Sequence, residues 1–423
     1  MQIKAIRGYE VLDSRGNPTL AAEVILENDQ ASLAFVPSGA STGKYEASER
    51  RDSDPDRYFG KGVSLAVETI NKEISQVIRG VDIEDINLID NLMIEADGTE
   101  NKEKFGANSI LALSMACVKA ASKLNKKSIH DFLNALQVDK FSTNYTQSLP
   151  VPMMNILNGG AHADNPIDFQ EFMVQPKGFE SFSESLRCGV EIFQSLKNIL
   201  QNKGLSTSVG DEGGFAPMLH SPEEALNLIL EAIEISGYKA GEDVYICLDI
   251  AATEFYSGSE YILEGMGQKY NTSEMIKYIE KLNNNYPISS IEDPLAEDDW
   301  SGWVNMTSKM GSKTQLVGDD LFVTNPKRIK KGIEQNAANS VLIKVNQIGT
   351  ISETIQAVKI AREANYDCVI SHRSGETEDT FISDLAVGLG VGQIKAGAPS
   401  RSDRVAKYNR LLLIESKSKL SII

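Results

Sequence analysis

Acidic residues recur where short apolar runs end in the second half of the sequence. Asp249 closes VYICLD, Glu292 closes ISSIE, and Asp319 follows LVG. Burying an unpaired carboxylate costs several kcal/mol, so each acid requires a cation, an arginine or a helix N-terminus. If the three converge, hard oxygen ligands without neighbouring histidine or cysteine favour Mg²⁺ over Zn²⁺. The alternative, that each acid caps the following helix, explains a single case better than the repeated pattern.

Basic residues follow the next apolar runs along the chain. Lys344 lies in LIKVN, His372 and Arg373 follow CVIS, and Lys395 follows GQI. Acids on one side and bases on the other fit a divalent metal and a substrate with carboxylate and phosphate groups, because arginine binds oxyanions with two hydrogen bonds. Lys344, among apolar residues and near other cations, is predicted to have a lowered pKa and to act as a base. A lysine that extends to solvent at the rim is the alternative.

Two glycine-rich stretches offer further polar side chains. VGDEGGFAP (209–217) contains Glu212, and NGGAHADNPIDFQEF (158–172) contains His162, Gln170 and Glu171. Glycine lets the backbone approach a ligand closely, although such stretches are usually only turns. We therefore regard these residues as site candidates that need the strand-end residues for support.

The stretch SGASTGKY (38–45) superficially resembles a phosphate-binding Walker loop. Three residues separate its glycines where that motif has four, and Tyr45 replaces the Ser or Thr that would bind magnesium. The stretch is better interpreted as a mobile lid with glycine hinges.

Helical stretches such as TSEMIKYIEKL and ISETIQAVKIAREA separate the apolar runs. Many consecutive βα units on one chain predict a closed parallel barrel, whose chemistry lies at the C-terminal ends of the strands. An open doubly wound sheet is the alternative, but the glycine-rich fingerprint that normally follows its first strand is missing. We therefore predict an α/β barrel over residues 145–423.

The first part of the sequence has a different hydrophobic pattern. Short β-rich runs and turns over the first 45 residues predict a three-stranded meander, and helical periodicity follows from residue 61. These elements predict a smaller α+β domain over residues 1–135. The polar segment 136–152, which ends in prolines, is the expected boundary.

Composition limits the class of partner and compartment. The 423 residues contain 42 Lys+Arg and 59 Asp+Glu, a net charge of −17 that repels nucleic acid and anionic membranes. No signal-peptide pattern or apolar run of membrane-spanning length is present, so we expect a cytoplasmic protein. The four scattered cysteines are expected to be small core residues in a reducing compartment.

Longer motifs carry a family resemblance. They are DSRGNPT, VPSGASTG, NGGAHADN, QEFM, VGDEGGFAP, SIEDPL, VGDDLFVTNP, LIKVNQIGT, SHRSGETEDTFI, GQIKAG and RSDRVAKYNRLL. With these motifs the chain resembles the enolase family from about residue 3 to residue 415. The resemblance implies an irregular ββαα(βα)6 barrel. It also implies reversible, Mg²⁺-dependent dehydration of 2-phospho-D-glycerate to phosphoenolpyruvate through a metal-stabilised enolate, in glycolysis and gluconeogenesis.

The resemblance also implies a role for each matching residue. Lys344 would remove the C2 proton, and Glu212, supported by Glu171, would donate a proton to the departing C3 hydroxyl. Two Mg²⁺ ions are implied, and their ligands would be Asp249, Glu292 and Asp319 for the first and Ser41 of the lid for the second. The implied substrate contacts are His162, Gln170, His372, Arg373, Ser374 and Lys395.

Three positions depart from the family pattern. Ala21 stands where an acid is usual and Leu413 where an arginine is usual. In well-known members this acid and this arginine form an ion pair across the dimer interface. Losing both avoids a stranded charge, so we expect a homodimer or higher homo-oligomer held by an apolar contact. Ala396 replaces a usual threonine and affects the expected positioning of Lys395.

The alternatives to the enolase reaction fall into two classes, related enzymes and non-catalytic roles. A mandelate-racemase-type cousin usually carries K-x-K where this chain reads DFQEF, and a phosphonate-processing paralogue is a nearer alternative. A non-catalytic scaffold in an RNA-processing degradosome, or a receptor reaching the cell surface without a signal peptide, belongs to another class. The receptor role often uses a C-terminal lysine, whereas this sequence ends in Ile423.

Overall fold

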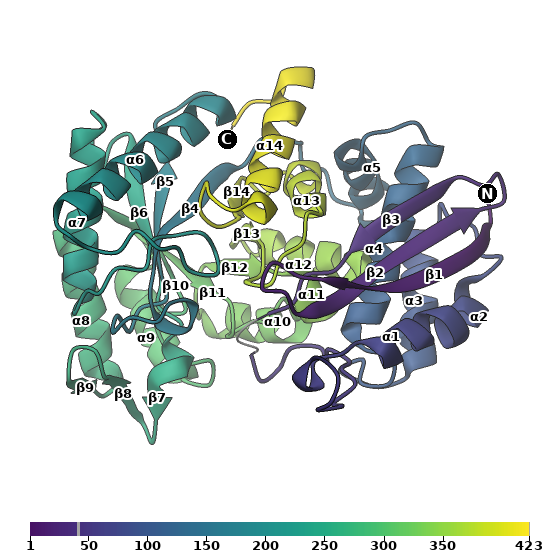
Figure 1. The fold of residues 1–423 in the computed structure, drawn as a ribbon, viewed down its shortest axis with the longest axis horizontal. Helices are drawn as coiled ribbons and strands as arrows, with labels where there is room; N and C mark the ends of the chain where they lie inside the picture. Colours follow the sequence, from purple (N-terminus) through teal and green to yellow (C-terminus); the bar gives the residue numbers. More distant parts are fainter. Residues whose placement is uncertain (40–42, 423) are drawn as a thin grey trace.

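A computed structural model describes residues 1–39 and 43–422 of the chain. Figure 1 shows two parts side by side, a barrel with its surrounding helices and a smaller sheet with helices against one face. Ser41, and with it the centre of the lid expected at 38–45, lies outside the described residues.

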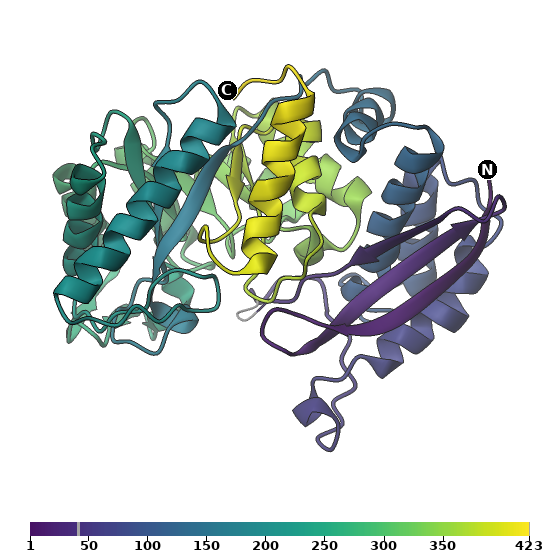
Figure 2. The ribbon, with the colours of Figure 1, turned by 45° about the horizontal axis from the view of Figure 1, so that its top comes forward.

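The small sheet is the predicted meander. It consists of β1 (Ile3–Leu12), β2 (Pro18–Leu26) and β3 (Ala31–Phe35), paired antiparallel in that order. Helices α1 (Ser64–Thr69), α2 (Ser75–Ile78), α3 (Ile86–Asp97), α4 (Ala107–Leu124) and α5 (Ile129–Phe141) follow. Figure 2 shows the sheet lying across these helices. The small residues of α4 allow it to pack closely against β2 and β3, and nearly all of its length is buried.

Eight strands close the barrel in the order β10-β11-β12-β13-β14-β4-β5-β6. Their bounds are β4 (Val151–Asn158), β5 (Glu171–Pro176), β6 (Val244–Asp249), β10 (Ile288–Glu292), β11 (Gln315–Gly318), β12 (Ser340–Ile343), β13 (Asp367–Ser371) and β14 (Gln393–Lys395). Strand β5 runs antiparallel to both neighbours, and the other pairings are parallel. The predicted irregular ββαα(βα)6 barrel is therefore confirmed.

Helices surround the barrel in chain order. They are α6 (Phe182–Asn202), α7 (Pro222–Ile235), α8 (Thr272–Asn285), α9 (Trp300–Met310), α10 (Pro326–Gln335), α11 (Val345–Ile348), α12 (Ile351–Glu363), α13 (Phe381–Leu389) and α14 (Ser402–Lys417). Local sequence explains where several begin, because Ser181, Ser221 and Asn271 accept the N–H groups of Glu184, Glu224 and Glu274 as N-caps. A short hairpin sheet of β7 (Tyr256–Ser257), β8 (Glu260–Leu263) and β9 (Gln268–Tyr270) precedes α8.

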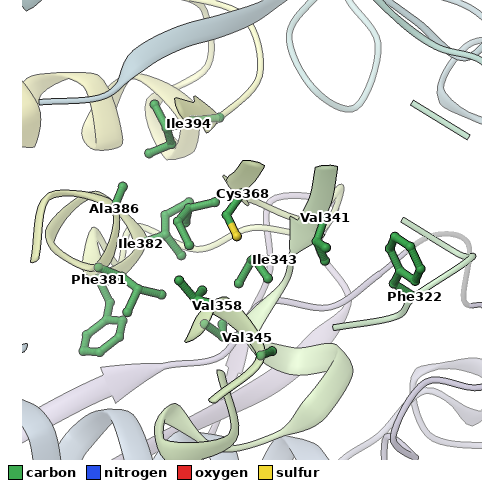
Figure 3. Close-up of a cluster of buried hydrophobic side chains, with 14 of the residues drawn as sticks. Phe322, Val341, Ile343, Val345, Val358, Cys368, Phe381, Ile382, Ala386 and Ile394 are labelled. Atoms are coloured by element: carbon green, nitrogen blue, oxygen red, sulfur yellow. The ribbon is translucent and has the colours of Figure 1, made fainter. Parts of the chain in front are cut away.

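Apolar side chains fill the barrel and the layer outside it. Inside, a buried cluster consists of Met153, Met173, Cys247, Val317, Leu342 and Val369. Outside, Figure 3 shows residues of β12 to β14 facing residues of α12 and α13, among them Val341, Ile343, Cys368, Ile394, Val358, Phe381, Ile382 and Ala386. All four cysteines are buried and free, as expected of core residues.

The small domain contacts the barrel through polar groups at the start of α12. Asp90 of α3 and Ser114 of α4 accept the N–H groups of Ser352 and Ile351, each at 3.0 Å. The Lys102 ammonium lies 3.0 Å from the Glu353 carboxylate. The two parts are thus joined next to the connection that follows β12.

The two positions of the expected dimer contact differ in exposure. Ala21 is buried in β2 at 1% exposure, whereas Leu413 on α14 is 51% exposed, so the expected dimer contact stays a prediction. Among the described helices, none has the length and apolarity needed to cross a membrane.

Asp384 of α13 connects three helices from both parts. Its carboxylate accepts hydrogen bonds from Arg410 Nη2 and Nε at 2.6 and 2.7 Å and lies 3.0 Å from His130 Nδ1. Burial acts to raise the pKa of Asp384, but His130 and Arg410 outweigh burial and lower it. Because the folded-state pKa lies below the unfolded value of about 4, this stabilisation is complete above that pH and is lost as pH falls through the folded pKa.

We predict that Asp384→Asn lowers the free energy of unfolding by about 2–3 kcal/mol at pH 7, since it removes the carboxylate partner of Arg410. Urea denaturation should show the difference from wild type shrinking toward pH 3, below the unfolded-state pKa of about 4. Asp139→Asn, at an exposed acid of α5, is the control and should stay within about 0.5 kcal/mol. A loss no larger than that of the control would contradict the role of Asp384.

Candidate active site

A pocket lies at the C-terminal ends of the barrel strands. It is lined by His162, Gln170, Glu171, Glu212, Asp249, Lys344, Ser371, His372, Arg373, Ser374 and Lys395. All of these except Ser371 are candidates from the sequence. Glu292 and Asp319 adjoin the pocket through contacts with Lys395 and Lys344. The open space is only about 20 Å³, because lysine side chains extend across the mouth to the carboxylates.

Strand register explains why three carboxylates converge. Glu171 is paired with Asp249 across β5 and β6, and Asp249 with Glu292 across β6 and β10. Lys395, at the end of β14, places its Nζ 2.9 Å from Asp249 Oδ2, 2.9 Å from Glu292 Oε1 and 3.2 Å from Glu171 Oε1. Burial acts to lower the pKa of Lys395, but the nearby carboxylates outweigh burial and raise it well above its usual value. Lys395 is therefore a charged ammonium that compensates three acids.

Lys344 follows β12, and its ammonium forms an ion pair with Asp319. The second oxygen of Asp319 accepts from Gln347 Nε2 at 2.8 Å, and the Lys344 N–H donates to Thr324 Oγ1 at 2.9 Å. Burial lowers the pKa of Lys344, as expected, but Asp319 outweighs burial and raises the pKa overall. The predicted lowered pKa is therefore wrong for this arrangement, because the sequence did not reveal the ion pair.

Asp293 is an acid of the site that the sequence analysis missed. Its carboxylate accepts the N–H groups of Asp319 at 2.9 Å and of Asp320 at 2.8 Å, and its own φ is +40°. Burial, and then Asp320, raise the pKa of Asp293 well above its usual range. The signal in the sequence was its position directly after Glu292 in SIEDP.

The acids of this mouth fit a divalent cation. Oxygens of Asp293, Asp319 and Asp320 lie within 4.8 Å of one another, so of the predicted ligands Asp249, Glu292 and Asp319 only Asp319 belongs to this group. Burial and then Asp249 raise the pKa of Glu292 well above its usual value, because the two carboxylates lie close together. Because the donors are carboxylate oxygens on neighbouring strand ends, they suit a hard cation such as Mg²⁺. Ser41, the expected ligand of a second cation, lies outside the described residues.

A second cluster lies on the β5 side of the mouth. His162 Nδ1 is 3.5 Å from Glu171 Oε1 and 3.7 Å from Glu212 Oε1, and Asn155 donates to Glu212 Oε2 at 3.2 Å. Burial and then Glu212 raise the pKa of Glu171 well above its usual value. Burial also acts to raise the pKa of Glu212, but its contacts with His372 and His162 outweigh burial and hold the pKa low.

His372 is a neutral hydrogen-bonding group. Its Nε2 lies 3.2 Å from Glu212 Oε2, and its Nδ1 contacts the Arg404 guanidinium. Burial lowers the pKa of His372 to about 4. Arg404 also donates to the carbonyl oxygens of Arg373 and Ser374, which fixes the loop after β13. The sequence analysis quoted Arg404 within RSDRVAKYNRLL but assigned it no role.

Arg373 joins the barrel to the small domain. Its Nη1 donates to Glu46 Oε2 at 2.9 Å and to Asn346 Oδ1 at 3.0 Å, and its Nη2 donates to Glu46 Oε1 at 3.3 Å. The two side chains of this ion pair are 4% and 8% exposed. Glu46 lies 327 residues from Arg373 in the chain, so the sequence offered no signal of this contact.

These contacts define what the mouth can do. Lys344, Glu171, Glu212 and the Arg373 guanidinium line one pocket, and the metal-compatible acid Asp319 adjoins it through Lys344. Such a set can hold a small anionic substrate, remove a proton from carbon and protonate a leaving oxygen.

Two protein-family models match the chain. The model described as enolase, N-terminal domain, matches residues 3–133, and the model described as enolase, C-terminal TIM barrel domain, matches residues 146–420. Together the matches cover nearly the whole chain.

We predict that Lys395→Ala makes the folded protein more dependent on a divalent cation, because Glu171, Asp249 and Glu292 lose their shared ammonium. In chelator, the melting temperature of the variant should fall below that of wild type. Excess Mg²⁺ should then raise it by more degrees than it raises the wild type, because the cation binds the folded state. Calorimetric melts of both proteins measure this, and an equal Mg²⁺-induced rise in both would contradict the proposed compensation.

Proposed function

The chain belongs to the enolase family, and we propose that it catalyses the reversible dehydration of 2-phospho-D-glycerate to phosphoenolpyruvate. The family matches themselves establish a lyase of the enolase superfamily that uses a divalent metal. The specific substrate is the proposal, together with its place in glycolysis and gluconeogenesis.

The observation that carries the proposal is the placement of two proton-transfer groups across the barrel. Lys344 follows β12 and Glu171 begins β5, and these strands are four positions apart in either direction around the ring of eight. Glu212 lies beside Glu171 through His162. Elimination of water requires proton removal at one carbon and protonation of the hydroxyl on the next. Groups on opposite walls can act on the two faces of one small substrate.

Lys344 is the proposed base at C2, a role that requires the neutral amine; a cation held by Asp319 would offset the carboxylate that raises the pKa of Lys344. Its side chain reaches the pocket from the end of β12. Thr324 accepts its backbone N–H, and Gln347 donates to its ion-pair partner Asp319. As it takes the proton, Lys344 becomes an ammonium, and it and Lys395 place positive charge beside the negative charge that develops on the substrate. Preorganised cationic groups of this kind stabilise developing negative charge.

Glu212 is the proposed acid at the C3 hydroxyl. The Glu171 and Glu212 pair is proposed to supply the hydrogen, and His162 contacts both carboxylates. Asn155 and His372 hold the second Glu212 oxygen. The hydroxyl then leaves as water, and the pair is recharged from solvent before the next turnover.

The residues that would hold the divalent metal are Asp249, Glu292 and Asp319. The Asp293 carboxylate accepts the Asp319 N–H and so supports Asp319. A cation bound there supplies positive charge to the substrate carboxylate. Arg373 and Ser374 are proposed to bind the phosphate, because a guanidinium donates two parallel hydrogen bonds to an oxyanion.

The direct test is phosphoenolpyruvate formation from 2-phosphoglycerate, followed by ultraviolet absorbance. We expect turnover with Mg²⁺, none with excess chelator, and a loss of about 10²-fold or more in Asp319→Asn, which removes a charged metal ligand. Asp139→Asn is the surface control and should match wild type. A folded, magnesium-loaded wild type without turnover would contradict the proposal and favour the phosphonate-processing or scaffold alternative.

A further inference from the structure

The Glu46 carboxylate is hydrogen-bonded to the Arg373 guanidinium, the group that is proposed to bind phosphate. Glu46 accepts from both terminal nitrogens of Arg373, at 2.9 Å from Nη1 and 3.3 Å from Nη2. The pair is buried, so its Coulomb attraction is screened little by solvent. An arginine in such a place requires a counter-charge, and Glu46 supplies it from the other domain.

Glu46 is held in position independently of Arg373. Its Oε1 accepts from the Gly43 N–H at 3.0 Å and from Gln347 Nε2 at 3.3 Å. Gln347 also donates to Asp319 at 2.8 Å, and the Gln347 carbonyl accepts from the Ala47 N–H at 2.9 Å. The carboxylate is therefore held near the guanidinium by Gly43 and Gln347 as well as by Arg373.

The space around the ion pair allows exchange of partners. A second cavity, of about 350 Å³, has Glu46, Arg373, Asn346, Glu49 and Arg51 among its lining residues. Arg373 thus borders both this cavity and the pocket at the barrel mouth. A carboxylate displaced from Arg373 has room to move without repacking the apolar core.

We propose that Glu46 is a resident counter-ion of Arg373 that competes with the phosphoryl group of the substrate and so weakens phosphate binding. This proposal rests on the proposed function for the identity of the anion. A phosphoryl group that binds the same N–H groups must replace the carboxylate. One that binds other N–H groups must share the guanidinium with it. In both cases the carboxylate lowers the net attraction for phosphate and favours release of a phosphorylated product.

The test is the affinity of the full-length protein for inorganic phosphate, measured by calorimetry in the presence of chelator. Glu46→Gln keeps an acceptor for Gly43 N–H but removes the charge, so the dissociation constant of phosphate should fall about tenfold or more. Glu49→Gln is the matched control, since Glu49 lines the same cavity but pairs with Arg51 at 2.7 Å. It should leave phosphate affinity within about twofold of wild type.

Two further variants keep the proposal falsifiable. Glu46→Asp retains the charge on a shorter side chain that withdraws from the guanidinium, so it should give a smaller gain in phosphate affinity. Combining Glu46→Gln with Arg373→Ala should abolish the gain, because the counter-ion acts only through Arg373. Unchanged or weaker phosphate binding in Glu46→Gln, no gain in Glu46→Asp, or a gain that persists without Arg373 would overturn the proposal.

Steady-state kinetics separate this role from a structural one. The KM of Glu46→Gln for 2-phosphoglycerate should fall and kcat/KM should rise, because the phosphate is bound in both the ground state and the transition state, whereas a distorted site would raise KM and lower kcat. Because phosphate binding is measured without turnover, a variant that binds phosphate more tightly in an inactive protein supports the counter-ion and contradicts the proposed function. Turnover by the wild type without a gain in phosphate affinity in Glu46→Gln supports the proposed function and contradicts the counter-ion.

Discussion

Compensation of buried charge at the barrel mouth is the constraint on which the rest of the structure depends. Eight strand ends bring carboxylates and cationic side chains into one enclosed place, where each uncompensated charge costs several kcal/mol. Lys395 compensates Glu171, Asp249 and Glu292, while Lys344 compensates Asp319. The groups that would bind metal and substrate therefore also bind one another.

This constraint explains the part played by the small domain. Its residues carry the counter-charge of Arg373 and the acceptors at the start of α12, the helix that follows the Lys344 connection. The domain does more than cover the barrel, because Glu46 and Gln347 extend one hydrogen-bonded network from the small domain to Asp319. A change in how the two parts pack would alter both the phosphate end and the metal end of the pocket.

Sequence reasoning predicted the barrel and most of the pocket because both follow from local pattern. Apolar runs that end in charged residues place Asp249, Glu292 and Lys395 at strand ends, and closure of the sheet brings them together. Contacts made by tertiary packing gave no such signal. Glu46 reaches Arg373 from the other domain, and Arg404 supports the loop after β13 from α14. The pKa of Lys344 was predicted with the wrong sign because its direction depends on one ion pair.

The central claim is that the base and the acid act separately from opposite walls of the pocket. Exchange of the C2 hydrogen of 2-phosphoglycerate with deuterated solvent, followed by NMR in the presence of Mg²⁺, tests it most directly. Glu212→Gln should still exchange this hydrogen while forming no phosphoenolpyruvate, and Lys344→Ala should do neither. Exchange that persists in folded Lys344→Ala, or that disappears in folded Glu212→Gln, would contradict the account.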